Sequence, residues 1–387
     1  MITMECDLCS GDKLEVRYKV PTTRRNLSIY VCKNCGLVQS FPKIDHVKDN
    51  NIAISGDADW GNIRYGKGFV SKKAIIKLSE TIDLKKIHNC LDIGSNRGSF
   101  VIGLSNISPK MEFIAIEPDT RIINEYDNKP KIKIINDRFE NVELEKNMFD
   151  LVYCSHTLEH LKSPRQSIKK IFEVMKPDGI LYLEVPNLDK INQLNLIEEW
   201  FIDKHLYHFS PELLEKYILI ENFQIINKNS NDDLNIIIIA KKLKNNNLKI
   251  ELENYTEYKK NINIIEDYKN TLKTNQLKLK KIGEHINKLS KENKMMIWGA
   301  GRILDRLVKL GNLELHSING LIDKFLSKYV DEIHGLVLKN PHEINWGKQD
   351  IVLISSREYF EEIKKEVMKY NNKLKIIGLN DLLLEFN

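Results

Sequence analysis

Four cysteines near the start of this 387-residue chain constrain its fold most, because they form two Cys-x-x-Cys pairs: Cys6 with Cys9, and Cys32 with Cys35. Each pair places two thiolates on one side of a tight turn, and two pairs complete the tetrahedral sulfur shell that zinc prefers. A shell of four thiolates leaves no open position for water, so we expect the metal to hold structure and not to do chemistry. The spacing therefore predicts a zinc ribbon over residues 1–43.

Composition sets looser bounds. A chain of this length is expected to form two or three domains, and its 42% hydrophobic and 29% charged residues are ordinary for a globular protein. The net charge of +5 is spread over the whole chain and is a weak argument for nucleic acid or a membrane as partner. No apolar run approaches the ~20 residues of a membrane span, and the first residues lack a secretion signal. We therefore expect a cytoplasmic protein in which Cys90 and Cys154 are buried, free thiols.

The second informative feature is a glycine-rich turn, Asp92-Ile-Gly94-Ser-Asn96-Arg-Gly98, which follows a predicted strand at residues 89–93. Glycines let the backbone approach a ligand closely, and the start of the following helix offers free N–H groups. The next predicted strand, residues 112–117, ends in Glu117, whose carboxylate can accept hydrogen bonds from both hydroxyls of a ribose. Together these features predict a site for a nucleotide-like cofactor.

Strand and helix patterns alternate from residue 88 to residue 242, which is typical of a doubly wound α/β sheet. Three more strands and a closing hairpin are expected, at residues 132–135, 149–154 and 179–185, and at 223–227 with 234–240. A closing hairpin differs from a nicotinamide-binding fold, which would continue with another βαβ repeat. The polar and aromatic residues 136–139 are positioned to bracket an adenine ring.

The rest of the chain predicts a helical linker and a second Rossmann-like α/β domain. Residues 244–292 carry apolar residues at helical spacing, with an expected break near Thr274 and Asn275. This apolar stripe packs either on the neighbouring domains or on a second chain, so an oligomer formed through the linker stays open. In the last domain a strand enters the turn Gly299-Ala-Gly301, and Asp323 follows a second strand. That turn either binds the phosphates of a substrate nucleotide or is an empty structural turn.

Residues 88–242 resemble the class I S-adenosylmethionine (SAM)-dependent methyltransferase domain. The glycine-rich turn looks like the cofactor loop of that family, and residues 149–161 look like its fourth-strand motif. Asn96 departs from the glycine that many members have at this position. The resemblance implies that SAM contacts the following residues: Asp92, Gly94, Ser95, Asn96, Gly98, Glu117, Pro118, Asp137, Arg138, Phe139, Ser155 and His156.

The order of the domains carries a second, more specific resemblance, to the zinc-ribbon-containing nucleotide-sugar C-methyltransferase family. The order is a ribbon at 1–43, a SAM domain at 44–243, a linker at 244–292 and an α/β domain at 293–387. Residues 32–39 also look like the second cysteine pair of that family. The resemblance implies an enzyme that methylates a carbohydrate or a nucleotide-linked sugar.

Methyl transfer requires alignment of the reactants and, for an unactivated nucleophile, a base. The family carries Glu-His where this chain has Lys204-His205, so the resemblance implies His205 as the base. The change from glutamate leaves both carbon and oxygen open as the acceptor atom. His208 is the second candidate for the base, and Tyr65 is expected to contact the substrate. The structural alternatives are a helix cap for His208 and strand-end roles for His156 and His160.

A nucleic-acid methyltransferase whose ribbon grips RNA is the rival interpretation. It would require a basic ribbon studded with aromatic residues, and binding that depends strongly on salt. The basic residues of the ribbon are offset by acidic ones: Arg17, Lys19, Arg24 and Arg25 against Glu5, Asp7, Asp12 and Glu15. This balance favours a small-molecule acceptor.

Overall fold

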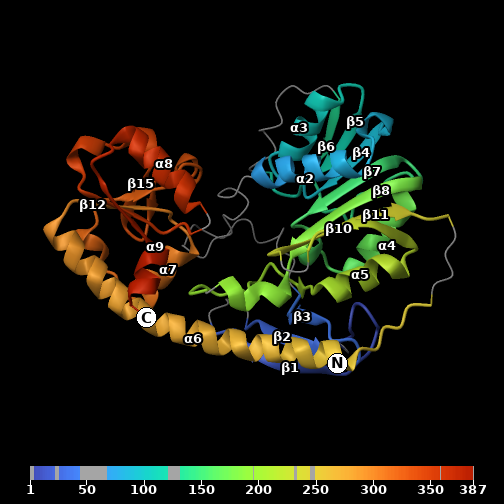
Figure 1. The fold of residues 1–387 in the computed structure, drawn as a ribbon, viewed down its shortest axis with the longest axis horizontal. Helices are drawn as coiled ribbons and strands as arrows, with labels where there is room; N and C mark the ends of the chain where they lie inside the picture. Colours follow the sequence, from blue (N-terminus) through green and yellow to red (C-terminus); the bar gives the residue numbers. More distant parts are fainter. Residues whose placement is uncertain are drawn as a thin grey trace. The chain divides into compact units, whose positions relative to one another are not determined.

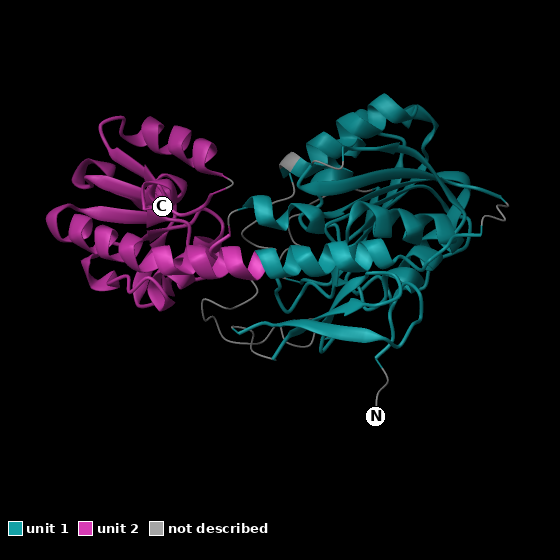
Figure 2. Ribbon diagram, turned by 60° about the horizontal axis from the view of Figure 1, so that its bottom comes forward, with its two compact units in different colours: residues 1–49, 65–194, 201–267 teal, residues 50–64, 195–200, 268–387 magenta. Residues whose placement is uncertain are grey.

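The structure is a computed structural model that describes residues 4–21, 26–43, 68–120, 131–194, 196–230, 233–244, 249–357 and 359–386. The chain divides into two compact units, which Figure 2 shows in different colours. The first unit comprises residues 1–49, 65–194 and 201–267, and the second comprises residues 50–64, 195–200 and 268–387. Tyr65, Arg24 and Arg25 lie outside the described residues.

The first unit is built on a seven-stranded mixed sheet with the order β10-β11-β8-β7-β4-β5-β6 (Figure 1). The strands are β4 (Asn89–Ile93), β5 (Glu112–Ile116), β6 (Ile132–Ile135), β7 (Phe149–Ser155), β8 (Met175–Pro186), β10 (Phe223–Lys228) and β11 (Asn235–Lys242). Strands β4 to β8 pair in parallel, whereas β11 is antiparallel to both β8 and β10. The predicted parallel strands and the closing hairpin are confirmed.

Alternate residues of these strands pack into separate cores on the two faces of the sheet. On one face, Cys90 and Tyr153 pack with α2 (Gly68–Thr81) and α3 (Ser99–Ile107). On the other, Leu91 and Cys154 pack with α4 (Pro164–Val174) and α5 (Pro211–Ile220). Coverage of both faces explains why the strands are nearly continuous apolar runs in the sequence. The expected burial of Cys90 and Cys154 is confirmed, since both are 0% exposed.

The cysteine-rich N-terminal segment forms a separate four-stranded antiparallel sheet. Its strands are β1 (Leu14–Lys19), β2 (Ser28–Cys32), β3 (Val38–Phe41) and β9 (Tyr207–His208). Strand β9 comes from the segment after β8, and it joins the sheet through the pairs Val38 with His208 and Gln39 with Tyr207. The sequence did not predict this strand. Cys6, Leu8 and Leu37 also belong to the core that α4 and α5 cover, so this sheet and the central sheet share one core.

Helix α6 (Tyr255–Glu292) occupies most of the predicted linker. Its amphipathic character is confirmed by the buried side chains of Ile265, Leu279 and Ile286. The predicted break near Thr274 and Asn275 is wrong, because the helix is continuous through both residues. Asn275 is 3% exposed, and its amide donates a hydrogen bond to the carbonyl of Leu196 at 2.9 Å, so the buried amide has a partner without a break.

The second unit is built on a six-stranded sheet with the order β14-β15-β13-β12-β16-β17. Its strands are β12 (Met295–Trp298), β13 (Leu321–Ile322), β14 (Glu332–Ile333), β15 (Leu336–Lys339), β16 (Ile351–Ile354) and β17 (Lys375–Gly378). Only β14 is antiparallel to its neighbour. The helices are α7 (Arg302–Lys309), α8 (Phe360–Tyr370) and α9 (Leu379–Glu385). This arrangement agrees with the predicted second Rossmann-like sheet.

None of the helices in the described residues combines the length and the apolar character that crossing a membrane requires.

Candidate active site and metal centre

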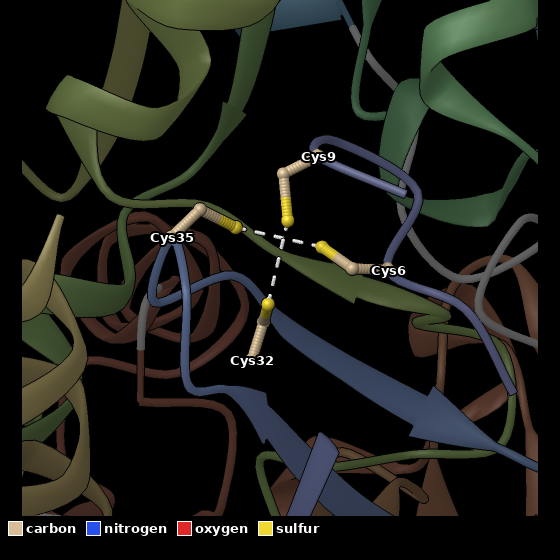
Figure 3. A group of neighbouring side chains, drawn as sticks. All are labelled: Cys6, Cys9, Cys32 and Cys35. Carbon is tan, nitrogen blue, oxygen red and sulfur yellow. Dashed lines mark hydrogen bonds between the residues drawn. The ribbon is translucent and has the colours of Figure 1, made fainter. Parts of the chain in front are cut away.

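The four cysteines of the paired motifs converge on one point (Figure 3). The Sγ atoms of Cys6 and Cys35 are 3.4 Å apart, those of Cys9 and Cys32 are 3.5 Å apart, and all four lie within 4.8 Å of one another. A tetrahedral zinc site with bonds of about 2.3 Å places its sulfur atoms about 3.8 Å apart, so this spacing fits zinc. The cluster therefore has the distances of a zinc ribbon.

The ribbon sheet holds the segment that carries the candidate base. The Oγ atom of Ser40, on β3, donates a hydrogen bond to the carbonyl of His205 at 2.8 Å and lies 3.0 Å from Nε2 of His208. The Ser40 N–H donates to the carbonyl of Leu206 at 2.9 Å. Ser40 is fully buried, so water cannot replace these interactions easily. The position of His205 thus depends on the ribbon.

The glycine-rich turn lies at the carboxyl end of β4, as predicted. Gly94, Asn96 and Gly98 all have positive φ angles, of 70°, 51° and 70°. A Cβ atom at Gly94 would lie 2.2 Å from Oγ1 of Thr157, so only glycine fits between this turn and the loop after β7. The turn therefore brings the backbone of residues 94–98 against the segment that begins at Ser155.

Glu117 lies next to the glycine-rich turn. It is 4% exposed, and its carboxylate accepts hydrogen bonds from the N–H groups of Asn96 at 2.8 Å and Asp119 at 2.9 Å. Each oxygen keeps further acceptor capacity for a hydroxyl donor. Asp92 and Ser95 are also buried, at 1% and 3% exposure. These contacts fix an anionic side chain at the place where the sequence predicts a ribose.

The residues predicted at the adenine differ in how accessible they are. Asp137 is exposed, and hydrogen bonds from Asn141 and from the Arg138 N–H lower the pKa of its carboxyl. Arg138 is 8% exposed and engages Glu140 and the carbonyl of His160. Phe139 is 2% exposed and belongs to the α4/α5 core. The burial of Phe139 argues against the predicted contact with adenine, whereas Asp137 remains accessible to a ligand.

Glu184, on β8, is a buried carboxyl group that the sequence analysis missed. Its carboxylate accepts hydrogen bonds from Ser155 at 3.0 Å, Tyr182 at 3.3 Å and the amide of Asn235 at 3.0 Å. The same amide nitrogen lies 3.2 Å from Nε2 of His156. Because an amide nitrogen only donates, Nε2 of His156 accepts and its Nδ1 carries the proton. Ser155 and His156 are therefore held in one polar network at the end of β7.

Glu159, His160 and His205 form a second cluster of side chains with metal-ligating groups. One ligand atom from each lies within 4.8 Å of the other two. Glu159 and His160 belong to the short helix η4 (Leu158–His160), which follows β7, and His205 lies just before β9. The Leu206 N–H donates to the carbonyl of Glu159 at 2.8 Å, and the His160 and His205 rings are 4.9 Å apart. We call this group the Glu-His-His cluster.

Burial raises the pKa of Glu159, but His160 and His156 beside it outweigh this effect, so the pKa lies below its usual value. The carboxyl group is 2% exposed, and neither of its oxygens has a hydrogen-bond partner among the described residues. Nε2 of His160 lies 3.7 Å from Oε1 of Glu159, and Nδ1 of His156 lies 3.8 Å from the same oxygen.

His208 lies in a different environment from His205. It is 4% exposed, and burial lowers its pKa to about 3, although Glu159 opposes this shift. A buried, neutral imidazole held by Ser40 suits a structural role, which argues against the prediction of His208 as a base. The predicted helix cap is also not His208, because Ser210 occupies the cap position of α5.

The comparisons with known proteins concern the domains separately. Residues 66–228 match a family described as a methyltransferase domain, and residues 291–377 match one described as C2185-like, N-terminal. A tRNA U34 carboxymethyltransferase from Desulforapulum autotrophicum is 24% identical over 155 residues, which cover 38% of this chain and 44% of that protein. A carboxy-S-adenosyl-L-methionine synthase from Nautilia profundicola is 23% identical over 145 residues, which cover 35% of this chain and 61% of that protein.

A solved SAM-dependent methyltransferase from Mesorhizobium loti is similar at a TM-score of 0.37 and 11% identity, covering 43% of this chain and 96% of that one. The chain spans about half the length of the two curated relatives, at 44% and 61%. The sequence matches support a class I, SAM-dependent methyltransferase domain at the centre of the chain. They do not confirm the resemblance to nucleotide-sugar C-methyltransferases, and the name of one relative refers to tRNA.

Proposed function

We propose that this chain is a SAM-dependent methyltransferase that acts on a carbohydrate or a nucleotide-linked sugar. The observation that carries the proposal is the arrangement at the carboxyl end of the central sheet. There the glycine-rich turn and Glu117 adjoin the loop that carries Ser155 and His156, and the Glu-His-His cluster follows in the same loop. A cofactor side and an acceptor side thus share one edge of a parallel sheet, where α/β enzymes bind their ligands.

On the cofactor side, Gly94 to Gly98 would hold the methionine portion of SAM, and Glu117 would bind its ribose. Asp137 would contact the adenine from the accessible end of β6. When bound, SAM supplies an electrophilic methyl group. The protein aligns that group with the acceptor and excludes water from it.

On the acceptor side, His205 is our candidate for the group that promotes loss of the acceptor's proton. It lies within reach of Glu159 and His160, and its main chain is fixed by Ser40. The carbonyl of Lys204 is 3.0 Å from Nδ1 of His160, so the lysine contributes to this site through its backbone. This contact does not depend on the side chain at position 204, which is where the chain departs from the sugar methyltransferases.

We further propose that Cys6, Cys9, Cys32 and Cys35 bind one structural zinc ion. The sulfur spacing supports this assignment, and the shell leaves no position for a substrate. The ion would stabilise the sheet that contains β9 and would thereby keep His205 in place.

The C-terminal domain is proposed to bind the nucleotide portion of the acceptor. Support comes from Gly299, whose φ of 113° gives the strand-to-helix turn after β12. Asp323, however, accepts hydrogen bonds from the N–H groups of Phe325 and Leu326, so its carboxylate stabilises the local turn. A truncated protein ending near residue 290 that folds and methylates a small acceptor with an unchanged Michaelis constant would restrict this domain to a structural role.

The decisive experiment is incubation of the enzyme with methyl-labelled SAM and a pool of nucleotide-linked sugars, followed by mass spectrometry. We expect a labelled sugar product that is absent when His205→Ala replaces the native enzyme. Label in added RNA, with none in the sugar pool, would overturn the proposed acceptor and leave the methyltransferase assignment intact.

A nucleic-acid acceptor is the second candidate, because one relative is named as a tRNA-modifying enzyme. A cavity of about 580 Å³ beside the ribbon provides a test of this idea. Its basic side chains, Lys43, Arg165 and Lys169, are matched by Glu5, Asp7 and Glu221. A surface that follows phosphates carries an excess of positive charge, and the lining of this cavity has none. Binding of RNA that weakens steeply between about 50 and 200 mM salt would instead favour the second candidate.

A further inference from the structure

We infer that Glu159, His160 and His205 form a binding site for one divalent transition-metal ion, separate from the cysteine cluster. Two imidazoles and one carboxylate are a common ligand set for first-row metals in catalytic sites. The binding of the ion does not depend on the proposed function, whereas its role toward an acceptor oxygen rests on it. A His205 ring that binds the ion has no lone pair left for a proton, so with the ion bound His205 would promote loss of the acceptor's proton through the ion and not as the base itself.

The first argument is the state of Glu159. The carboxyl group is 2% exposed and accepts no hydrogen bond from any described residue, and a polar group without a partner is costly to bury. Nε2 of His160 and Nδ1 of His156, at 3.7 Å and 3.8 Å from the carboxyl group, are too distant for hydrogen bonds. A cation between Glu159 and the imidazoles would compensate the carboxylate directly.

The second argument is the tautomer of His160. Its Nδ1 lies 3.0 Å from the carbonyl of Lys204, and a carbonyl oxygen can only accept, so Nδ1 carries the proton. The lone pair of a neutral ring is then on Nε2, which is the nitrogen that faces Glu159. Metal-binding histidines usually donate their second nitrogen to a carbonyl or carboxylate in this way.

The third argument concerns which of the histidines near Glu159 can bind the ion. His156 also lies near Glu159, but its Nε2 accepts from Asn235 and its Nδ1 carries the proton, so it offers no lone pair toward the carboxylate. His208 is held by Ser40 inside the ribbon interface. The remaining imidazole beside Glu159 and His160 is that of His205.

The geometry needs little adjustment to accept an ion. Metal bonds of about 2.0–2.2 Å hold ligand atoms roughly 3.0–3.5 Å apart, so donors within 4.8 Å of one another must approach by at most about 1.3–1.8 Å. Rotation of side chains supplies such a shift. The side chain of His160 is 31% accessible, so the site opens to solvent on one side. Three protein ligands then leave coordination positions for an acceptor hydroxyl or carbonyl oxygen.

Titration of zinc-loaded protein with Mn²⁺, followed by the electron paramagnetic resonance of free Mn²⁺, tests this site. We expect one saturable Mn²⁺ per chain in addition to the zinc. Glu159→Gln should weaken Mn²⁺ binding by more than the roughly 10–100-fold that loss of an outer-shell partner costs. His160→Gln should have a similar effect and serves as the second variant if Glu159→Gln does not fold.

A matched control exists on the surface of the second unit. Nε2 of His316 lies 3.7 Å from Glu314, the same separation as in the His160–Glu159 pair, but both side chains of this pair are exposed. His316→Ala should leave Mn²⁺ binding unchanged. Circular dichroism and SAM calorimetry on each variant check that the fold and the cofactor site are intact.

The inference is overturned if neither Mn²⁺ nor Co²⁺ binds beyond the cysteine site, or if both cluster variants bind the ion like the native protein. Methyl transfer is assayed separately, with and without a chelator that leaves the zinc in place. Mn²⁺ binding without methyl transfer would support the site and refute the function. Methyl transfer that is unchanged by the chelator, in protein that binds no Mn²⁺, would support the function and refute the site.

Discussion

The cysteine cluster and the Glu-His-His cluster lie in the same unit, and the β3–β9 pairing connects them, yet their surroundings differ. The cysteine cluster has four equivalent donors, of which Cys6, Cys32 and Cys35 are at most 2% exposed. The Glu-His-His cluster has three donors of two kinds, and it opens to solvent through His160. The first arrangement is closed and suits stability, whereas the second keeps room for a reacting group.

This difference implies that the two clusters fail in different ways. Loss of the cysteine cluster should remove the structure that supports the Glu-His-His cluster. The ribbon holds His205 through the hydrogen bond from Ser40 and through the pairing of β3 with β9. Loss of the open cluster should leave the fold and the cofactor site intact. The following predictions test this contrast in order of expected effect.

The largest effect is expected from replacing two thiolates together, Cys6→Ser with Cys35→Ser. Structural zinc sites contribute on the order of 10 kcal/mol to the folding of small zinc domains, so the ribbon should unfold and turnover should be lost. Elemental analysis and thermal unfolding measure the two results. Cys90→Ala, in the core of the central sheet, should retain one zinc per chain. Native stability and turnover in the zinc-free double variant would show that neither the fold nor the proposed acceptor site depends on the metal-bound ribbon.

His205→Ala should lower turnover by roughly 10²–10⁴-fold, the usual contribution of a group that assists proton removal. SAM affinity should change little, because the residues predicted to contact SAM, within positions 92–98, 117–118, 137–139 and 155–156, do not include His205. Single-turnover kinetics and calorimetry separate these effects. His316→Ala is the control for removal of an imidazole. A His205 variant with near-native turnover would exclude this cluster from catalysis.

The sequence predicted the closed cluster better than the open one for a physical reason. The cysteine ligands occur in two local pairs, and a local pair sets its own turn geometry. The open cluster joins η4 to residue 205, about 45 positions later, through a two-residue strand that no periodicity reveals. His205 was predicted through a resemblance, whereas Glu159 and Glu184 were missed because their significance depends on burial. An acid shortly after a predicted buried strand was the available signal for Glu159.

The strands of the central sheet were predictable for the opposite reason. Helices cover both faces, so the strands appear as apolar runs with glycine and acid at their carboxyl ends. The break predicted in α6 is wrong because the low helix preference of Asn275 is offset when its buried amide has a hydrogen-bond partner outside the helix. The carbonyl of Leu196 satisfies it, and residues so far apart in sequence give no local signal of that contact.

Glu117→Ala tests the proposed SAM site separately from the two clusters. Removing a charged hydrogen-bond acceptor costs on the order of 1.5–3 kcal/mol, which corresponds to roughly ten- to a hundredfold weaker SAM binding. The loss should appear in the SAM dissociation constant, measured by calorimetry, and not in zinc content. Glu112→Ala, at the exposed start of β5, is the control. Unchanged SAM affinity in Glu117→Ala would remove the proposed ribose site.

The smallest and most specific effect is expected from Ser40→Ala, which removes the hydrogen bond from the ribbon to His205 without replacing a member of either cluster. The change leaves the His205 carbonyl and Nε2 of His208 without their partner inside a buried region, at a cost of about 1–3 kcal/mol. His205 should move to relieve part of this penalty, and the movement should lower turnover by up to about tenfold. Zinc binding and SAM binding should stay native. Ser28→Ala, on β2 of the same sheet, should preserve turnover. If Ser40→Ala lowers only the melting temperature and turnover stays native, the ribbon stabilises the enzyme but does not position its acceptor site.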